Sequence, residues 1–169
     1  LIIMLVFLFI LFNVIKPFID KNDVEKKRLL KHAYTDSLTQ ILNRRAFMTA
    51  FNRELCLLKR QSIGNATLIL MDLDNFKVVN DTYGHAVGDD VLRGVARTLK
   101  NNVRVSDIIA RFGGEEFIFL LPDTDLASAS LLCKKIGVYI KKESITYAPN
   151  TALSQVTASM GIINLSNEL

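Results

Sequence analysis

The sequence predicts an α+β domain in which a sheet containing antiparallel strands is flanked by helices, in the order βααββαβ. Short apolar runs rich in β-branched residues alternate with longer segments whose apolar residues recur every three or four positions. Two of the apolar runs, 108–112 and 117–121, are separated only by a turn that contains Gly113 and Gly114. This spacing is typical of a hairpin and gives the sheet its antiparallel part.

The N-terminal segment, residues 1–19, is almost wholly apolar and predicts a transmembrane helix. A bilayer span takes about 20 residues. Because the sequence starts without Met, we expect this run to be part of a longer helix; a buried core helix is the alternative. Basic residues from Lys16 to Lys31 place that side in the cytoplasm by the positive-inside rule. Residues 20–35 predict a charged helical linker.

The composition excludes few functions but bears on two. The net charge is only +4, and much of the basic excess lies between Lys16 and Lys31, so nucleic-acid binding is not expected. The two cysteines, Cys56 and Cys133, match no metal-binding spacing and predict buried thiols.

The remaining elements follow from spacing and from side-chain chemistry. Asp36 and Thr39 have oxygens that can cap a helix or hold a turn. The apolar pattern then predicts a helix around 47–58, followed by a strand at 67–71 that is buried on both faces. A short helix at 75–83 and a second helix ending near Asn101 come next, before the hairpin. After the hairpin we expect a helix following Pro122, with Leu126 and Cys133 facing inward, and a strand at 155–165.

Acidic residues follow the predicted strands. Asp72 comes directly after the buried strand, where a carboxylate is costly unless it is paired or binds a cation. Glu115 lies on the hairpin turn, and strand pairing would bring it beside Asp72. Two such acids suit Mg²⁺, which prefers a few carboxylates together with substrate phosphates. The alternative is that these acids cap turns, and we adopt it for Asp74, as a helix N-cap.

Four motifs resemble one known family. Arg111-Phe-Gly-Gly-Glu-Glu-Phe117 resembles the signature of GGDEF-domain diguanylate cyclases, in its GGEEF form. The same family is matched, in the same order, by Asp36-Ser-Leu-Thr-Gln-Ile-Leu-Asn-Arg-Arg45, Met71-Asp-Leu-Asp-Asn-Phe-Lys77, Asn80-Asp81, Tyr83-Gly-His85 and Gly88-Asp89. The resemblance implies the palm-like fold of nucleotidyl cyclases and assigns residues 36–169 to a GGDEF domain, whose C-terminal helix and strand we expect beyond this sequence.

The resemblance also implies a metal site and a catalytic acid. It makes Asp72, the Leu73 carbonyl and Glu115 the ligands of two Mg²⁺ ions, which Mn²⁺ could replace. It makes Glu116 the catalytic acid that helps to deprotonate the attacking hydroxyl. A solvated turn acid is the alternative for Glu116.

The same resemblance implies a GTP site. Its members are Asn75, Phe76, Lys77, Asn80, His85, Asp89, Gly113 and Gly114. Lys77 stands at a predicted helix start, where backbone N–H groups favour phosphate, and the family gives it a transition-state role as well. Asn80 and Asp89 suit guanine, because a carboxylate can accept from its N1–H and amino group. An exposed lysine and a structural histidine are the alternatives for Lys77 and His85.

Arg104-Val-Ser-Asp107 precedes the hairpin and resembles the family's RxxD site for inhibition by product. A chance surface salt bridge is the alternative. The family can add an arginine from the following helix, and Lys135 stands near the corresponding place.

Taken together, the resemblance implies a membrane-anchored diguanylate cyclase at the bacterial inner membrane, with its GGDEF domain in the cytoplasm. It would join two GTP into cyclic di-GMP, release pyrophosphate, act as a homodimer and be inhibited by its product. The alternative is a catalytically idle module that binds cyclic di-GMP or GTP. All the signature acids and glycines are present, which favours the enzyme.

Overall fold

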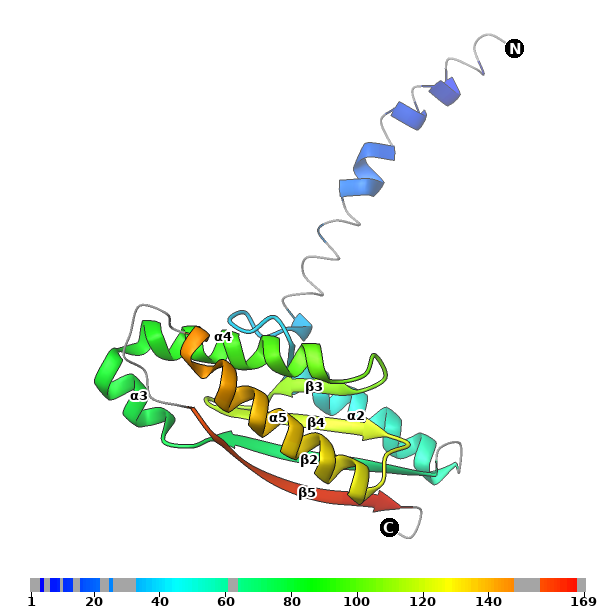
Figure 1. Cartoon of the computed structure of the whole chain (residues 1–169). Helices are drawn as coiled ribbons and strands as arrows, with labels where there is room; N and C mark the ends of the chain where they lie inside the picture. The colour runs from blue at the N-terminus through cyan, green and yellow to red at the C-terminus, as the bar shows by residue number, and fades with distance from the viewer. Residues whose placement is uncertain are drawn as a thin grey trace. The chain divides into compact units, whose positions relative to one another are not determined.

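The computed structural model describes residues 4, 7–9, 11–13, 16–21, 25, 33–60, 64–147 and 156–166, apart from the side chains of 144–146. The chain divides into two units, Leu1–Tyr34 and Thr35–Leu169 (Figure 1). The described residues of the N-terminal unit are helical, and their apolar side chains, such as Phe7, Phe9 and Phe12, are exposed.

The described residues do not support the predicted transmembrane helix. None of the helices that they form is both long enough and apolar enough to cross a bilayer. Much of the 1–19 segment, and most of the predicted 20–35 linker, lies outside the described residues.

The second unit has the predicted order of elements, preceded by a two-residue strand at Leu42–Asn43 that was not predicted. They are β1 (Leu42–Asn43), α2 (Arg44–Lys59), β2 (Asn65–Leu73), α3 (Phe76–Tyr83), α4 (His85–Asn102), β3 (Ile108–Arg111), β4 (Glu116–Pro122), α5 (Leu126–Tyr147) and β5 (Ala158–Ser166). From β2 to β5 this order is βααββαβ, so the predicted α+β fold is confirmed.

The strands form one mixed sheet in the order β1-β3-β4-β2-β5. The β3–β4 hairpin is antiparallel, and β2 pairs antiparallel with both β4 and β5, whereas β1 pairs parallel with β3. Because β2 lies between β4 and β5, its pairing with β4 fixes where its C-terminal acids lie relative to the hairpin.

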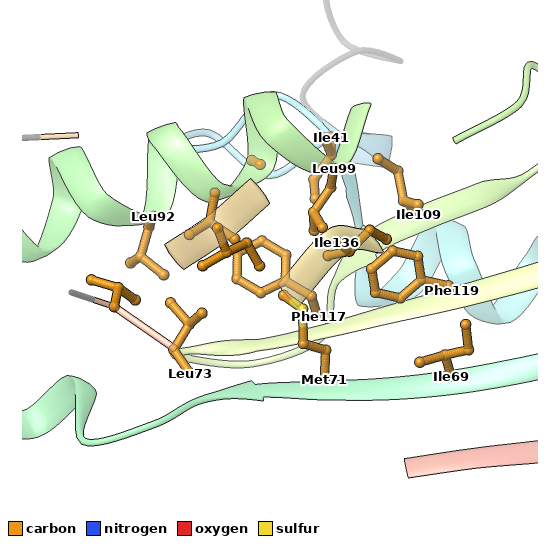
Figure 2. Close-up of a cluster of buried hydrophobic side chains, with 14 of the residues drawn as sticks. Ile41, Ile69, Met71, Leu73, Leu92, Leu99, Ile109, Phe117, Phe119 and Ile136 are labelled. Carbon is orange, nitrogen blue, oxygen red and sulfur yellow. The ribbon is translucent and has the colours of Figure 1, made fainter. Parts of the chain in front are cut away.

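The main core lies between one face of the sheet and the helices α4 and α5 (Figure 2). Alternate residues of a strand face the same side, so Ile69, Met71 and Leu73 of β2 all point into this core. Phe117 and Phe119 of β4 lie beside them, both fully buried. This packing holds the last residues of β2 and the first of β4 in fixed positions.

The two covering helices approach each other closely at Gly94 of α4. A Cβ at this position would collide with the Tyr147 ring of α5. The Tyr147 hydroxyl lies 2.9 Å from Thr98 Oγ1, which also donates a hydrogen bond to Glu143. These contacts fix α4, which carries Asp89 in its second turn and ends two residues before Arg104.

The opposite face of the sheet is covered by α2, where Phe47 and Leu58 pack against β4 and β3 residues. The prediction of a β2 strand buried on both faces is wrong at its C-terminal half. Leu70 is 44% exposed, and Ile163 of the neighbouring β5 is 55% exposed. The reason is that α2 packs beside β1 and β3 and does not reach these positions.

Two further expectations fail for similar reasons. Leu126 was expected to face inward but is 52% exposed, because it is the first residue of α5 and the buried face begins at Ala129. Cys56 was expected to be buried but lies on the exposed face of α2. Cys133 is half-buried, and burial raises the pKa of its thiol to about 11.

Candidate active site

The acids of the two strand ends meet at one edge of the sheet. Asp72, the next-to-last residue of β2, is the register partner of Glu116, the first residue of β4. The sequence had suggested Glu115 as the neighbour of Asp72; strand pairing instead brings Glu116 opposite, with Glu115 one residue before β4. All three carboxylates therefore gather at this end of β2.

The three carboxylates concentrate negative charge at this edge of the sheet. Although Asp72 is exposed, desolvation by the surrounding protein raises the pKa of its carboxyl, and the charges of Glu115, Glu116 and Asp74 raise it further. Mutual repulsion of this kind is relieved by a cation. Within the described residues no three His, Cys, Asp or Glu side chains form a ready-made metal cage. The ligands expected from the sequence are the carboxylates of Asp72 and Glu115 and the backbone carbonyl of Leu73, whose side chain is buried in the core.

Asp74 has a different environment and is not the helix N-cap that the sequence predicted. Its carboxylate accepts hydrogen bonds of 2.6 Å from Thr157 Oγ1 and from Ser159 Oγ. These two bonds, Ser159 first, hold the pKa of Asp74 below its usual range. Asn75 is the residue at the cap position of α3.

The hairpin turn brings the Glu116 carboxylate over Gly113. A Cβ on Gly113 would lie 2.7 Å from Glu116 Oε2, so any larger residue would displace this side chain. Gly114 is exposed, with open space where a Cβ would stand. The two glycines that the sequence singled out therefore differ: Gly113 makes room for Glu116, and Gly114 leaves the surface of the turn open.

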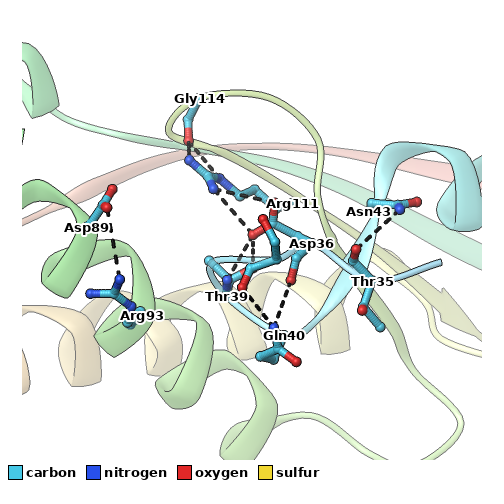
Figure 3. Close-up of polar contacts among 10 residues, drawn as sticks. Thr35, Asp36, Thr39, Gln40, Asn43, Asp89, Arg93, Arg111 and Gly114 are labelled. Atoms are coloured by element: carbon cyan, nitrogen blue, oxygen red, sulfur yellow. Dashed lines mark hydrogen bonds and ion pairs between the residues drawn. The ribbon is translucent and has the colours of Figure 1, made fainter. Parts of the chain in front are cut away.

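Arg111 ties this turn to the opening of the domain (Figure 3). Its Nε and Nη2 donate to the Gly114 carbonyl at 3.0 and 2.8 Å, and its Nη1 lies 3.3 Å from Asp36 Oδ1. Asp36 Oδ1 also accepts from Thr39 N and Oγ1, at 2.8 and 2.6 Å. Asp36 and Thr39 thus hold a turn, while Asn43 caps α2.

The start of α3 carries three of the predicted nucleotide-binding residues. Asn75 has a φ of 55°, and Phe76 is 7% exposed and anchors the helix in the core. Lys77 is exposed in the first turn. Lys77 therefore lies a few residues beyond Asp72, at the start of α3, where an anion can reach it.

The predicted guanine-binding residues come from facing helices. Asn80 of α3 lies against Gly88 of α4, where a Cβ would collide with the Asn80 Oδ1 atom. Gly88 immediately precedes Asp89, so Asn80 and Asp89 lie near the same turn of α4. The Asp89 carboxylate is about half exposed, with Arg93 at 3.9 Å. His85 is exposed at the first residue of α4.

The Arg104–Asp107 turn joins α4 to β3 on the surface. The Asp107 carboxylate accepts a hydrogen bond of 2.7 Å from the backbone N–H of Arg104. In the part of the chain that the structure describes, these two residues form no salt bridge. The acid shapes the turn, and the guanidinium of Arg104 is exposed.

Sequence reasoning missed two contributors to this site. Arg111 was predicted only as part of a motif, and its partner Asp36 stands 75 residues away. Gly88 also belongs to a motif, and its role is to leave space for Asn80. The opposite charges of Arg111 and Asp36, in two of the motifs, were the available signal for their contact. Nothing in the sequence pattern pointed to the role of Gly88.

The chain is similar in sequence to known proteins. Residues 33–168 match the family model described as "Diguanylate cyclase, GGDEF domain". The response regulator PleD of Caulobacter vibrioides is 40% identical over 141 residues, covering 82% of this chain and 30% of PleD. Diguanylate cyclase DgcM of Escherichia coli K12 is 42% identical over 135 residues, covering 77% of this chain and 32% of DgcM. The chain spans about a third of the length of these relatives.

Solved structures agree on the fold. The GGDEF domain of DgcB from Caulobacter crescentus, in complex with c-di-GMP, superposes with a TM-score of 0.74 at 30% identity, covering 81% of this chain and 80% of that one. Diguanylate cyclase SiaD of Pseudomonas aeruginosa, in complex with its activator SiaC, superposes with a TM-score of 0.72 at 30% identity. This match covers 95% of this chain and 61% of the SiaD chain.

Proposed function

The chain belongs to the GGDEF family of diguanylate cyclases, and we propose that it joins two GTP molecules into cyclic di-GMP with release of pyrophosphate. The observation that carries this proposal is the group of Asp72, Glu115 and Glu116 at one edge of the sheet, with the raised pKa of Asp72. Because the chain spans about a third of its relatives' length, the activity of the whole protein is part of the proposal.

The donor atoms fit a divalent cation. Asp72, the Leu73 carbonyl and Glu115 would hold Mg²⁺, two ions for each site, and Mn²⁺ could take the same oxygen ligands. A metal bound there would neutralise the triphosphate and would favour ionisation of the attacking 3′-hydroxyl. Glu116, half-buried opposite Asp72, accepts the proton of that hydroxyl.

The other residues bind and orient GTP. Lys77 meets the phosphates at the exposed start of α3, next to Asn75 and Phe76. Asn80 and Asp89 read the guanine edge, and His85 lines the same side of α4. Gly113 and Gly114 let the nucleotide approach the hairpin turn without a Cβ in the way.

The reaction needs two GTP molecules, and each domain presents one. A homodimer with facing active sites therefore belongs to the proposal, as does inhibition by cyclic di-GMP at Arg104 and Asp107. Product binding is supported by the DgcB GGDEF domain, which is 30% identical and was solved with c-di-GMP. Location at the cytoplasmic face of the bacterial inner membrane rests on the sequence pattern of residues 1–31 alone.

The direct test is turnover of GTP with Mg²⁺, with cyclic di-GMP followed by chromatography. We expect Glu116→Gln to lower turnover by a factor of about 100 or more, because the variant cannot accept a proton. Asp90→Asn is the matched control, since Asp90 is an exposed acid paired with Arg93 at 2.7 Å. Wild-type turnover in Glu116→Gln would remove this residue from the catalytic group.

The alternative function, an idle module that binds cyclic di-GMP or GTP, makes the opposite prediction. A folded wild-type protein that binds cyclic di-GMP but forms none from GTP would support that function.

A further inference from the structure

The outer face of α5 carries large aliphatic side chains in an exposed stripe. Leu131 and Val138 stand about two helical turns apart, so both lie on the same side of the helix. Leu131 is 70% exposed and Val138 is 65% exposed. Ile136 and Ile140, on the opposite side of the helix, are fully buried in the core. The inner face anchors α5 in the fold, and packing within the domain does not account for the outer stripe.

Four lysines flank this stripe. At about 100° per residue, Lys134 and Lys141 fall along one side of the Leu131–Val138 stripe, and Lys135 and Lys142 fall along the other. All four side chains are exposed. Lys134, Lys135 and Lys142 form no salt bridge with a residue that the structure describes. Positive charge therefore stands on both sides of an apolar crest.

The negative charge of α5 does not balance these lysines. The sequence of α5 contains four lysines and a single acid, Glu143. The Glu143 carboxylate accepts a hydrogen bond of 2.8 Å from Thr98, so it is directed toward α4 and away from the outer face. The neighbouring α4 differs, because its Arg93 is paired with Asp90 at 2.7 Å. The outer face of α5 therefore keeps a net positive charge.

We propose that the outer face of α5 binds the surface of a bilayer that contains anionic lipids. Leu131 and Val138 enter the boundary between headgroups and acyl chains, and the lysines pair with lipid phosphates. Lysine suits this position because its aliphatic stem lies along apolar surface while its ammonium group stays among polar groups. A nucleic acid would use the lysines but leave both aliphatic side chains in water, so the combination favours a bilayer.

This inference goes beyond the proposed function and does not depend on it. None of the residues of the outer face belongs to the candidate active site, and the contact with lipid requires no turnover of GTP. It agrees with the proposed location at the inner membrane, but it is carried by the exposure and charge of α5 alone.

Tryptophan fluorescence tests the contact, because the sequence contains no tryptophan. A Leu131→Trp variant of the full chain reports on the outer face of α5, whatever other segment touches the lipid. With vesicles that contain phosphatidylglycerol, we expect its emission to move to shorter wavelength and to be quenched by brominated acyl chains. With vesicles of phosphatidylcholine alone, we expect neither change, because the lysines then have no net negative surface to bind.

Met48→Trp is the matched control for position. Met48 is 41% exposed on α2, and α2 and α5 cover opposite faces of the sheet (Figure 1). Its emission should not respond to either kind of vesicle. Both substitutions replace an exposed side chain, so neither should disturb the core.

The double variant Lys134→Gln and Lys142→Gln, made in the Leu131→Trp protein, tests the role of charge. We expect the ratio of bound to free α5, taken from the quenched fraction, to fall about 25-fold, because each lysine near an anionic surface contributes a factor of about five. Lys59→Gln, which removes an exposed lysine of α2, is the control and should leave the ratio unchanged.

Three results would overturn the inference. The first is emission from Leu131→Trp that does not respond to anionic vesicles. The second is an equal response from Met48→Trp, because the chain would then meet lipid without a preferred face. The third is a shift in Leu131→Trp emission that grows with protein concentration in the absence of lipid, which would place a second copy of the chain on this face.

Discussion

Asp72 and Asp74 stand two residues apart at the end of β2, but their surroundings are opposite. Asp74 accepts hydrogen bonds from Thr157 and Ser159, and these lower its pKa. Asp72 faces Glu116 across the strand pair, and desolvation together with the charges of neighbouring carboxylates raises its pKa. Asp36 resembles Asp74, since burial would raise its pKa but hydrogen bonds from Thr39 and the charge of Arg111 outweigh that effect.

The difference separates acids that stabilise the fold from acids that are available for chemistry. Asp36 and Asp74 have their lone pairs satisfied by the protein, which links distant segments. Asp72 and its neighbours repel one another, so the protein keeps them at a cost in stability. Carboxylates left in this condition at a surface edge are expected to bind a cation.

Removing a partner of the hydrogen-bonded acids should have the largest effect on the free energy of unfolding. Arg111→Ala removes two hydrogen bonds to the Gly114 carbonyl and the contact with Asp36, in a pair whose side chains are only 18% and 22% exposed. We expect a loss of about 2–3 kcal/mol in the free energy of unfolding, measured by urea denaturation. Arg93→Ala, which breaks exposed pairs, should cost no more than about 1 kcal/mol. Equal losses would show that the Arg111 contacts contribute no more than a surface pair.

The two neighbouring aspartates should respond in opposite directions. Asp74→Ala leaves Thr157 and Ser159 without their acceptor and should lower the free energy of unfolding by about 1–2 kcal/mol. Asp72→Ala, without added metal, should leave it unchanged or raise it by about 0.5 kcal/mol, because one like charge opposite Glu116 is removed. Thermal unfolding of both variants in a chelating buffer measures this. Matching losses at the two positions would contradict the distinction.

The response to acid should be the smallest effect. The lowered pKa of Asp74 gives stability that is present above its unfolded pKa of about 3.9 and is lost as pH falls through the lowered value. The raised pKa of Asp72 acts the other way, with stability present below about pH 3.9 and lost as pH rises through the raised value. Between about pH 6 and pH 3, Asp74→Asn should therefore lose stability less steeply than wild type, and Asp72→Asn more steeply. If the free energy of unfolding fell with pH at the same slope in wild type and both variants, the result would argue against both pKa shifts.

Most of the fold could be predicted because each element has a local signal. The order βααββαβ follows from apolar spacing and from the Gly113-Gly114 turn, and α3 and α4 lie within a few residues of their predicted bounds. Exposure could not be predicted in the same way. Leu70 and Leu126 are apolar residues in regular elements, and whether they are buried depends on where α2 and α5 lie over the sheet.

The residues of the candidate site can be named from the sequence, but their arrangement cannot. Asp72, Glu115 and Glu116 were identified, but the register of β2 with β4, which places Glu116 opposite Asp72, depends on the hairpin geometry. The partners of Asp74 are 83 and 85 residues away, so local reasoning gave it a helix cap that it does not form. Contacts of this range come from packing and carry no short-range pattern.

The measurement that tests the central claim most directly is the shift in Tm with Mg²⁺ for wild type, Asp72→Asn and Asp74→Asn. If the unsatisfied acids are the cation site, Mg²⁺ at ten times its Kd should stabilise wild type and Asp74→Asn by about 1.4 kcal/mol each. Asp72→Asn should show no shift at the same concentration. A shift in Asp72→Asn equal to that of wild type would contradict the account, because the cation would then bind elsewhere.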